Sequence, residues 1–310
     1  MKRIGLALLV MAIFCAGYFN YQKKTAHTPR YTRKISSAKM TPYQKEMEKL
    51  LYSTFEPDQT YADLLLKNAN TLDYPIVYKR EQHLPCDCRE RIYQEFQDSL
   101  MQQPLSVKVR YIYNDDQQLL ESTHLNDGQL TSKLSYTRDD HGLIQKIRTI
   151  NQYGKFLTWF IYEKDRFHKV TLQDDVPAAY ETFFLSDLKQ VIRRSAIQTE
   201  LIPAISHSFN YDQLGRLTKE TTREAELIYE YPNDEEDVYS KFSYYRLNPR
   251  KLISINEITW DNNRQILVGK TANLQPSFRH IKEKTDNCTL RSYVYNENER
   301  LMSSTLDSCK

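Results

Sequence analysis

From about residue 106 onward, apolar and aromatic residues alternate with polar ones, and turn-forming residues recur at even intervals. Alternation with a period of two is typical of strands whose two faces see different surroundings. The predicted turns lie 11 to 13 residues apart, near Asp115, Asp127, Asp140, Tyr153, Lys164, Asp175 and Asp187. Scarce glycines lie in or beside turns, where a positive φ is needed, at Gly128, Gly142, Gly154 and Gly215. The pattern predicts a mainly β protein, an extended or curled antiparallel sheet of successive hairpins.

The residues before this sheet predict a small helical region over residues 41–104. Thr41 and Pro42 have the order of an N-cap followed by the first residue of a helix, and apolar residues follow at helical spacing as far as Phe55. Further helices are expected over residues 61–70 and 89–101. The hairpin domain then covers residues 105–310. Within it, residues 183–204 have helical spacing and predict a helix or an insertion, which is a suitable place for a partner site.

The N-terminus has the order of a targeting segment. Lys2 and Arg3 precede an apolar run over residues 4–19, which predicts a signal peptide or a membrane anchor. The basic residues 20–40 that follow are expected to form a linker. We therefore expect a periplasmic or other extracytoplasmic protein, either released or held at the inner membrane by residues 4–19. Two alternatives stay open: a lipid anchor at Cys15, and a cytoplasmic orientation favoured by the basic linker.

The turns resemble one another in residue type. Each combines an aromatic residue, a polar turn rich in Asp and Asn, and an apolar residue that begins the next strand. This pattern occurs at residues 111–119, 134–143, 160–167, 209–217, 258–266 and 293–301. The Asp or Asn side chain is expected to hold the turn by accepting hydrogen bonds from backbone amides.

One copy, Phe209-Asn-Tyr211-Asp212-Gln-Leu-Gly215-Arg216-Leu217, resembles the YD repeat of bacterial Rhs proteins and teneurins. The resemblance extends in weaker form over residues 106–305. It implies a long antiparallel sheet of hairpins that curls or wraps, and Tyr211, Asp212, Gly215 and Arg216 as the residues of the repeat turn. Rhs proteins use such sheets to enclose a toxin domain. A short chain with these repeats is therefore expected to bind a protein partner, as an immunity protein for an Rhs-like toxin would.

Four cysteines follow Cys15, and an even number fits an oxidising compartment. Cys288 and Cys309 flank a predicted hairpin and form the favoured disulfide. One alternative joins Cys86 and Cys88 to these two C-terminal cysteines, and another joins Cys86 to Cys88 in a strained, reducible bridge. A zinc site is a further interpretation, which the Cys-x-Cys spacing without a nearby His does not favour.

Composition and motifs exclude several classes of function. The net charge of +3 lacks the basic excess of a nucleic-acid-binding protein. His141 and His168 have no metal-ligand partner at a suitable spacing, and no nucleophile elbow, phosphate loop or dinucleotide fingerprint occurs. The acidic residues 234–237 lack the alternating ligands and the glycine of a calcium loop. We therefore expect no enzyme activity, no metal and no cofactor, although a site assembled from several strands would escape detection.

Tyrosines offer the remaining candidate surface. The sequence has 23 of them, and one region gathers Tyr229, Tyr231, Tyr239 and Tyr244. On a sheet these side chains form either a cross-strand ladder, which is the favoured interpretation, or a stacking platform for a ligand. Two functions follow. The first is a non-catalytic protein of the bacterial envelope that binds a protein partner. The second is a surface module that binds glycan or cell-wall material through the tyrosine-rich face.

Overall fold

The computed structural model describes residues 41–53, 55–68, 89–116, 118–197, 205–236, 239–261, 263–286 and 288–309. Two helices precede the sheet: α2 (Pro42–Leu50) and α3 (Gln59–Asn68). Thr41 caps α2, because its hydroxyl accepts from Gln44 N while the Gln44 side chain accepts from Thr41 N at 3.0 Å. The predicted start of the first helix is thus confirmed, and the second predicted helix corresponds to α3.

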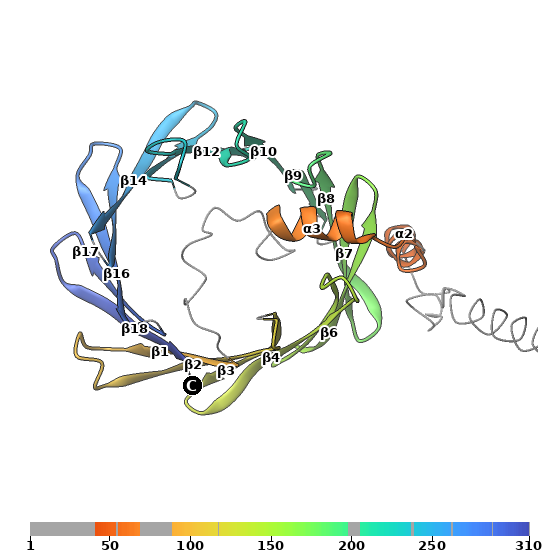
Figure 1. The fold of residues 1–310 in the computed structure, drawn as a ribbon, viewed down its shortest axis with the longest axis horizontal. Helices are drawn as coiled ribbons and strands as arrows, with labels where there is room; N and C mark the ends of the chain where they lie inside the picture. Colours follow the sequence, from red (N-terminus) through yellow and green to blue (C-terminus); the bar gives the residue numbers. More distant parts are fainter. Residues whose placement is uncertain are drawn as a thin grey trace, which may run out of the picture.

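Eighteen antiparallel strands form one sheet that closes on itself (Figure 1). They are β1 (Glu90–Phe96), β2 (Pro104–Tyr113), β3 (Leu119–Asn126), β4 (Gln129–Arg138), β5 (Ile144–Asn151), β6 (Gly154–Glu163), β7 (Arg166–Gln173), β8 (Val176–Leu185), β9 (Val191–Ile197), β10 (Ile205–Tyr211), β11 (Leu217–Thr221), β12 (Ala225–Glu230), β13 (Lys241–Arg246), β14 (Lys251–Asp261), β15 (Arg264–Thr271), β16 (Pro276–Asp286), β17 (Thr289–Asn296) and β18 (Leu301–Cys309). Each strand pairs with its neighbours in the chain, and β1 also pairs with β18, with Arg91 opposite Cys309 and Phe96 opposite Ser304.

The mainly β class is therefore confirmed, whereas the sheet is a closed barrel and not an open one. All seven predicted turns fall between strands of this barrel. Closure removes the exposed edges that an open sheet would leave at its first and last strands.

One predicted helix is wrong, and a second predicted segment is not helical in its described part. Residues 89–101 form β1 and the turn after it, because the backbone groups of β1 find partners on both β2 and β18. The sheet thus begins at Glu90, before the predicted boundary at residue 105. Within residues 183–204, the described part comprises the end of β8, a turn and β9. Leu185 and Val191 lie opposite each other across that hairpin and are buried, so their spacing reflects a strand–turn–strand arrangement.

The core lies on both faces of one part of the barrel wall. Phe160, Tyr162, Phe167 and Phe183 are buried on the inner face, where Tyr61, Ala62 and Leu65 of α3 pack against the same group. On the outer face, Met47 and Leu51 of α2 pack against Ile161, Val170 and Leu172. Figure 1 shows α3 within the outline of the ring and α2 outside it. Strands β6 and β7 are thus covered by a helix on each side.

Hairpin turns at the two ends of the barrel define two rims. We call them the Leu100 end, which holds the turn between β1 and β2, and the His141 end, which holds the turn between β4 and β5. Helix α2 begins at the Leu100 end, since Gln44 Nε2 donates to the carbonyl oxygen of Pro177 at 3.0 Å. Helix α3 lies at the His141 end, where Asn68 Nδ2 donates to the Leu188 carbonyl at 2.7 Å.

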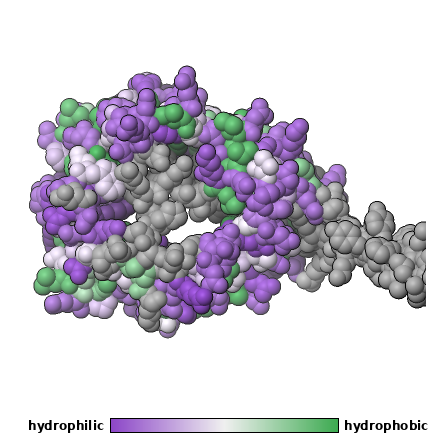
Figure 2. Space-filling view, in the orientation of Figure 1, coloured by the Kyte–Doolittle hydropathy of each residue, from purple (hydrophilic) through white to green (hydrophobic). Residues whose placement is uncertain are grey.

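The outer wall carries charged side chains that pair across neighbouring strands. Examples are Arg110 with Glu90, Lys133 with Glu121, and Arg264 with Glu283, at 2.8–2.9 Å. The space-filling view looks onto one end of the barrel and shows a mostly hydrophilic surface with scattered hydrophobic residues (Figure 2).

Among the described residues, no helix has the length and apolar character needed to cross a membrane. The predicted signal or anchor at residues 4–19 and the basic linker 20–40 lie outside the described residues. Their assignment stays a prediction.

Candidate functional site

A five-residue turn recurs around the barrel with the same hydrogen bonds. Its first residue donates its backbone N–H to the carbonyl of the fifth, at 2.8–3.0 Å, in the turns that begin at Asn114, Ser186, Asp212, Thr271 and Asn296. The turn that begins at Asp139 has the same hydrogen bond, from Asp139 N–H to the Leu143 carbonyl at 2.9 Å. Where the first residue is Asp or Asn, its side-chain oxygen also accepts from amides inside or just after the turn. The predicted role of these side chains is confirmed.

The turn with the YD-like sequence shows how its four predicted residues cooperate. Asp212 Oδ1 accepts from Leu214 N and Arg216 N, and Asp212 Oδ2 pairs with Arg216 Nε at 2.7 Å. Gly215 has a φ of +81°, which an L side chain rarely adopts. The Tyr211 hydroxyl donates to the Val191 carbonyl of the preceding hairpin at 2.8 Å.

The same link between hairpins recurs on either side of this turn. Tyr162 donates to Ile144 O at 2.7 Å, and Tyr231 donates to Leu217 O at 2.9 Å. Burial raises the pKa of Tyr211 above its ordinary range, so this hydroxyl stays a donor. Tyr162, Tyr211 and Tyr231 therefore each fasten their hairpin to the one before it, which is a structural role.

We expect Asp212→Ala to lower the free energy of unfolding by about 1–3 kcal/mol, because two amides and a half-buried guanidinium lose their acceptor. Chemical denaturation followed by tyrosine fluorescence or circular dichroism measures this. Asp187→Ala is the matched control, since Asp187 lies exposed in the equivalent turn of the β8–β9 hairpin. Equal effects from the two changes would contradict the assigned role of Asp212.

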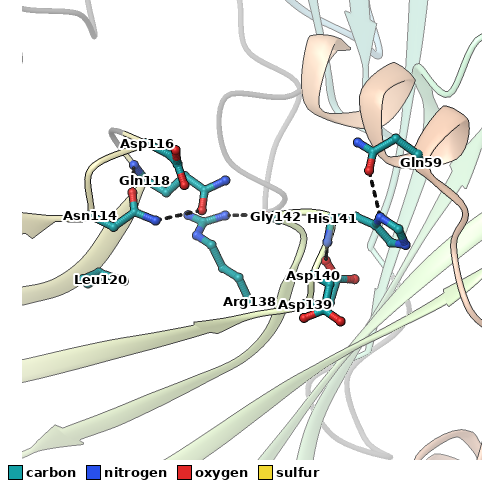
Figure 3. A pocket seen from close by; sticks show the side chains of 10 residues that line it. All are labelled: Gln59, Asn114, Asp116, Gln118, Leu120, Arg138, Asp139, Asp140, His141 and Gly142. Carbon is teal, nitrogen blue, oxygen red and sulfur yellow. Dashed lines mark hydrogen bonds between the residues drawn. The ribbon is translucent and has the colours of Figure 1, made fainter. Parts of the chain in front are cut away.

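Two neighbouring turns and the start of α3 enclose a polar pocket of about 420 Å³ at the His141 end (Figure 3). Its lining comprises Gln59, Asn114, Asp116, Gln118, Leu120, Arg138, Asp139, Asp140, His141 and Gly142. Helix α3 contributes Gln59, whose Oε1 lies 2.9 Å from His141 Nδ1. Docking of α3 onto the turn between β4 and β5 therefore supplies one side of the pocket.

The two turns fit together closely because Gly142 lacks a side chain. A Cβ at this position would lie 2.5 Å from Gln118 Nε2, and the φ of Gly142 is +83°. Arg138 Nη1 donates to the Gly142 carbonyl at 2.8 Å and forms the floor of the pocket. Asp139 Oδ1 accepts from the N–H groups of His141 and Leu143, so this carboxylate is occupied within its own turn.

At the Leu100 end, six successive hairpins each expose a large apolar side chain. We call this set the apolar arc. It runs from the β15–β16 hairpin through the closure seam to the β7–β8 hairpin, and it comprises Leu274, Met302, Leu100, Leu130, Tyr153 and Val176. Their exposed fractions run from 42% to 75%. Single exposed apolar residues are ordinary, whereas large contiguous apolar patches mark interaction surfaces.

Most tyrosines of the predicted platform contact other side chains of the protein. Tyr239 is buried, and its ring lies 5.3 Å from that of Tyr229, which packs against the inner core. Arg216 covers the ring of Tyr231 at 4.4 Å. Tyr244 lies opposite Leu227 within the sheet. The contact between Tyr229 and Tyr239 is of the kind that the ladder interpretation expects. The stacking platform stays a prediction.

The remaining sequence candidates also have structural surroundings. His168 is buried on the outer face, where Nδ1 lies 3.1 Å from Thr182 Oγ1, and burial lowers its pKa. Within the described part of the chain, no cluster of His, Cys, Asp or Glu is arranged to hold a metal ion. The expected absence of a metal and of enzyme activity nonetheless stays a prediction.

Two of the four cysteines with a predicted disulfide, Cys288 and Cys309, lie within the described residues. Cys309 is disulfide-bonded, and its backbone N–H donates to the Cys288 carbonyl at 3.1 Å. Cys86 and Cys88 lie outside the described residues, so the pairing of the four cysteines stays a prediction.

Sequence comparison gives no family: no family model matches the chain, and no curated protein matches it. A crystal structure of TcdB2–TccC3 is similar over 63% of this chain and 13% of that one, with 10% identity and a TM-score of 0.34. The Photorhabdus luminescens Tc holotoxin pore matches 64% of this chain and 14% of that one, at 9% identity and a TM-score of 0.33. This chain thus spans a small fraction of those proteins.

A porin-like protein from Bacteroides uniformis matches over 73% of this chain and 98% of that one, at 12% identity and a TM-score of 0.31. Likenesses at these scores do not establish a common fold, and no function follows from them. The YD repeat remains a resemblance carried by the turns.

Proposed function

We propose that the chain is a non-catalytic, extracytoplasmic protein that binds a protein partner through the Leu100 end of its barrel. The apolar arc carries this proposal. Hydrophobic tips on six adjacent hairpins offer a curved row of contacts, and aromatic and aliphatic side chains that become buried at an interface contribute most of its binding energy. The rigid wall holds these tips in place before binding, which limits the conformational entropy lost on association.

Charge indicates the kind of partner. On the turns of the arc, acidic residues outnumber basic ones: Asp98, Asp127, Asp174, Asp175, Glu297 and Glu299 against Lys155 and Arg300. Complementary potentials steer association and suppress unsuitable partners. The proposed partner therefore presents a basic surface with apolar positions that meet the arc.

The outer wall fits an aqueous location for the barrel. Pairs such as Lys133 with Glu121 lie within the strands on this wall, and a basic residue facing lipid at mid-bilayer costs about 2–4 kcal/mol. In this proposal the barrel stands in water, and residues 4–19 direct its export or tether it. More specifically, we propose that the partner is a toxin delivered by a sibling cell, on the basis of the YD-like turns.

Site-specific photo-crosslinking in cells tests the proposal. A photoreactive phenylalanine at Tyr153 should give a discrete cross-linked species, and Leu100→Asp combined with Leu130→Asp should weaken it at least about tenfold. The same probe at Leu214, which is 58% exposed at the His141 end, is the matched control. Equal cross-linking from both ends, or none from the arc, would refute the proposal.

The immunity version has a separate test. Deleting the gene should sensitise cells to toxins delivered by siblings, and a chain carrying the two aspartates should fail to restore protection. A deletion strain that is no more sensitive than its parent would remove the toxin from the proposal and leave the protein-binding role in place.

A further inference from the structure

Arg138 is an unusual residue to find at the floor of the polar pocket. It is half-buried, and no described carboxylate forms a salt bridge with it. Nη1 donates to the Gly142 carbonyl, while Nε is buried without a hydrogen-bond acceptor. Burial lowers the pKa of this guanidinium. Because a buried cation is stable mainly when it is paired, the floor of the pocket has a donor group suited to an anionic acceptor.

One wall beside Arg138 adds a neutral donor, the side-chain amide of Gln118. The Gln118 amide lies over Gly142 and points its nitrogen toward the same space. His141 stands on the other side, held by Gln59 of α3. A carboxylate placed above Arg138 would therefore meet donors from two turns, because Nη2 is not among the buried atoms and makes no hydrogen bond within the described residues.

The mouth of the pocket has the opposite charge. Asp116 and Asp140 are exposed, and Figure 3 shows them on opposite sides of Arg138. Asp139 is the third carboxylate nearby, but its Oδ1 is held by two backbone amides. The carboxylates would repel a simple anion, and Arg138 would repel a simple cation. A molecule that bears both charges satisfies both parts of the pocket.

We propose that this pocket binds a small zwitterion, an amino acid or the free ends of a short peptide, with its carboxylate on Arg138 and its ammonium between Asp116 and Asp140. The volume of about 420 Å³ lies in the range of small-molecule sites and admits a ligand of this size. The pocket lies at the opposite end of the barrel from the apolar arc, so the two sites are independent.

Calorimetric titration of the full chain with glycylglycine tests the inference. We expect saturable binding with a Kd of about 1 mM or tighter. N-acetyl-glycylglycine, which lacks the ammonium, and glycylglycine amide, which lacks the carboxylate, should each bind at least about tenfold more weakly. No saturation by glycylglycine, or equal binding of all three probes, would overturn the proposal.

Two variants test where the ammonium and the carboxylate of the ligand bind. Asp116→Asn with Asp140→Asn changes only exposed side chains and should abolish the preference for glycylglycine over its N-acetyl form. Arg138→Gln should abolish the preference over the amide, with circular dichroism confirming the fold. The control is Asp115→Asn, since Asp115 is exposed, pairs with Arg89 and does not line the pocket. Unchanged preferences in the Asp116 and Asp140 variant would refute the assigned ammonium site, whatever the outcome for Arg138.

A change at the other end separates this inference from the proposed function. Leu130→Asp should leave glycylglycine binding unaltered and reduce only partner cross-linking. Loss of both properties in that variant would show that the two ends are coupled, which contradicts their independence here.

Discussion

Phe167→Ala should lower the free energy of unfolding by about 3–5 kcal/mol, one of the two largest effects that we expect for this chain. Phe167 is 1% exposed. Its ring stacks on that of Phe183 with centroids 4.5 Å apart, and it lies 6.0 Å from the ring of Tyr162. Truncation removes the stacked pair and leaves a cavity under α3 that rigid neighbouring strands cannot fill.

Thermal unfolding followed by circular dichroism measures this effect. At roughly 2–4 °C for each kcal/mol in a large domain, the midpoint should fall by about 10 °C. Tyr153→Ala removes a ring that is 73% exposed on the same sheet, so it should change stability by no more than about 0.5 kcal/mol. A fall of less than about 3 °C for Phe167→Ala would mean that this cluster is not the core of the barrel.

The sequence predicts those parts of the structure that interactions between nearby residues determine. It does not predict the parts that depend on distant residues. The turns near Asp115 and Asp140 were predictable because Asp and Asn side chains hold them through contacts within four residues. The start of α2 at Thr41 is equally local. Such signals survive in a single sequence, since they need no distant partner.

The third predicted helix failed for the opposite reason. Ile92, Phe96 and Leu100 recur every four residues, which fits one face of a helix. In the barrel, Ile92 lies opposite Ser308 and Arg110, so pairing with two distant strands outweighs this local pattern. A spacing of four is also a multiple of two, and the pattern alone cannot separate the two structures.

The pocket could be predicted only in pieces. Gly142 and Asp139 could be assigned to a turn from the sequence, but His141 meets Gln59, which lies 82 residues earlier, only through the docking of α3. Arg138 carried no signal, because an arginine at the end of a strand is ordinary until its burial and lack of an ion pair are known. The tyrosine cluster gave a strong compositional signal, and only the structure shows that Tyr229 and Tyr239 pack against each other.

Closure of the barrel is the feature that no local pattern could indicate. It joins β1 to β18, and at this seam Arg91 pairs with Asp307 across 216 residues of chain. Both side chains point to the inner face and are only 18% and 10% exposed. Although burial works against it, the Asp307 carboxylate holds the pKa of Arg91 above its usual value. This ion pair therefore lies where the first and last strands meet.

Asp307→Ala should lower the free energy of unfolding by about 3–5 kcal/mol, because it leaves the Arg91 charge buried and unpaired. Hydrogen exchange should rise first in β1 and β18, the strands of the seam.

Glu283→Ala is the matched control, because it breaks the ion pair between Glu283 and Arg264. Their side chains are 28% and 54% exposed, so this change should cost no more than about 1 kcal/mol. Arg91→Met combined with Asp307→Leu should recover most of the loss, since apolar side chains can replace a buried pair. If the single change costs no more than the control, the seam does not depend on this pair.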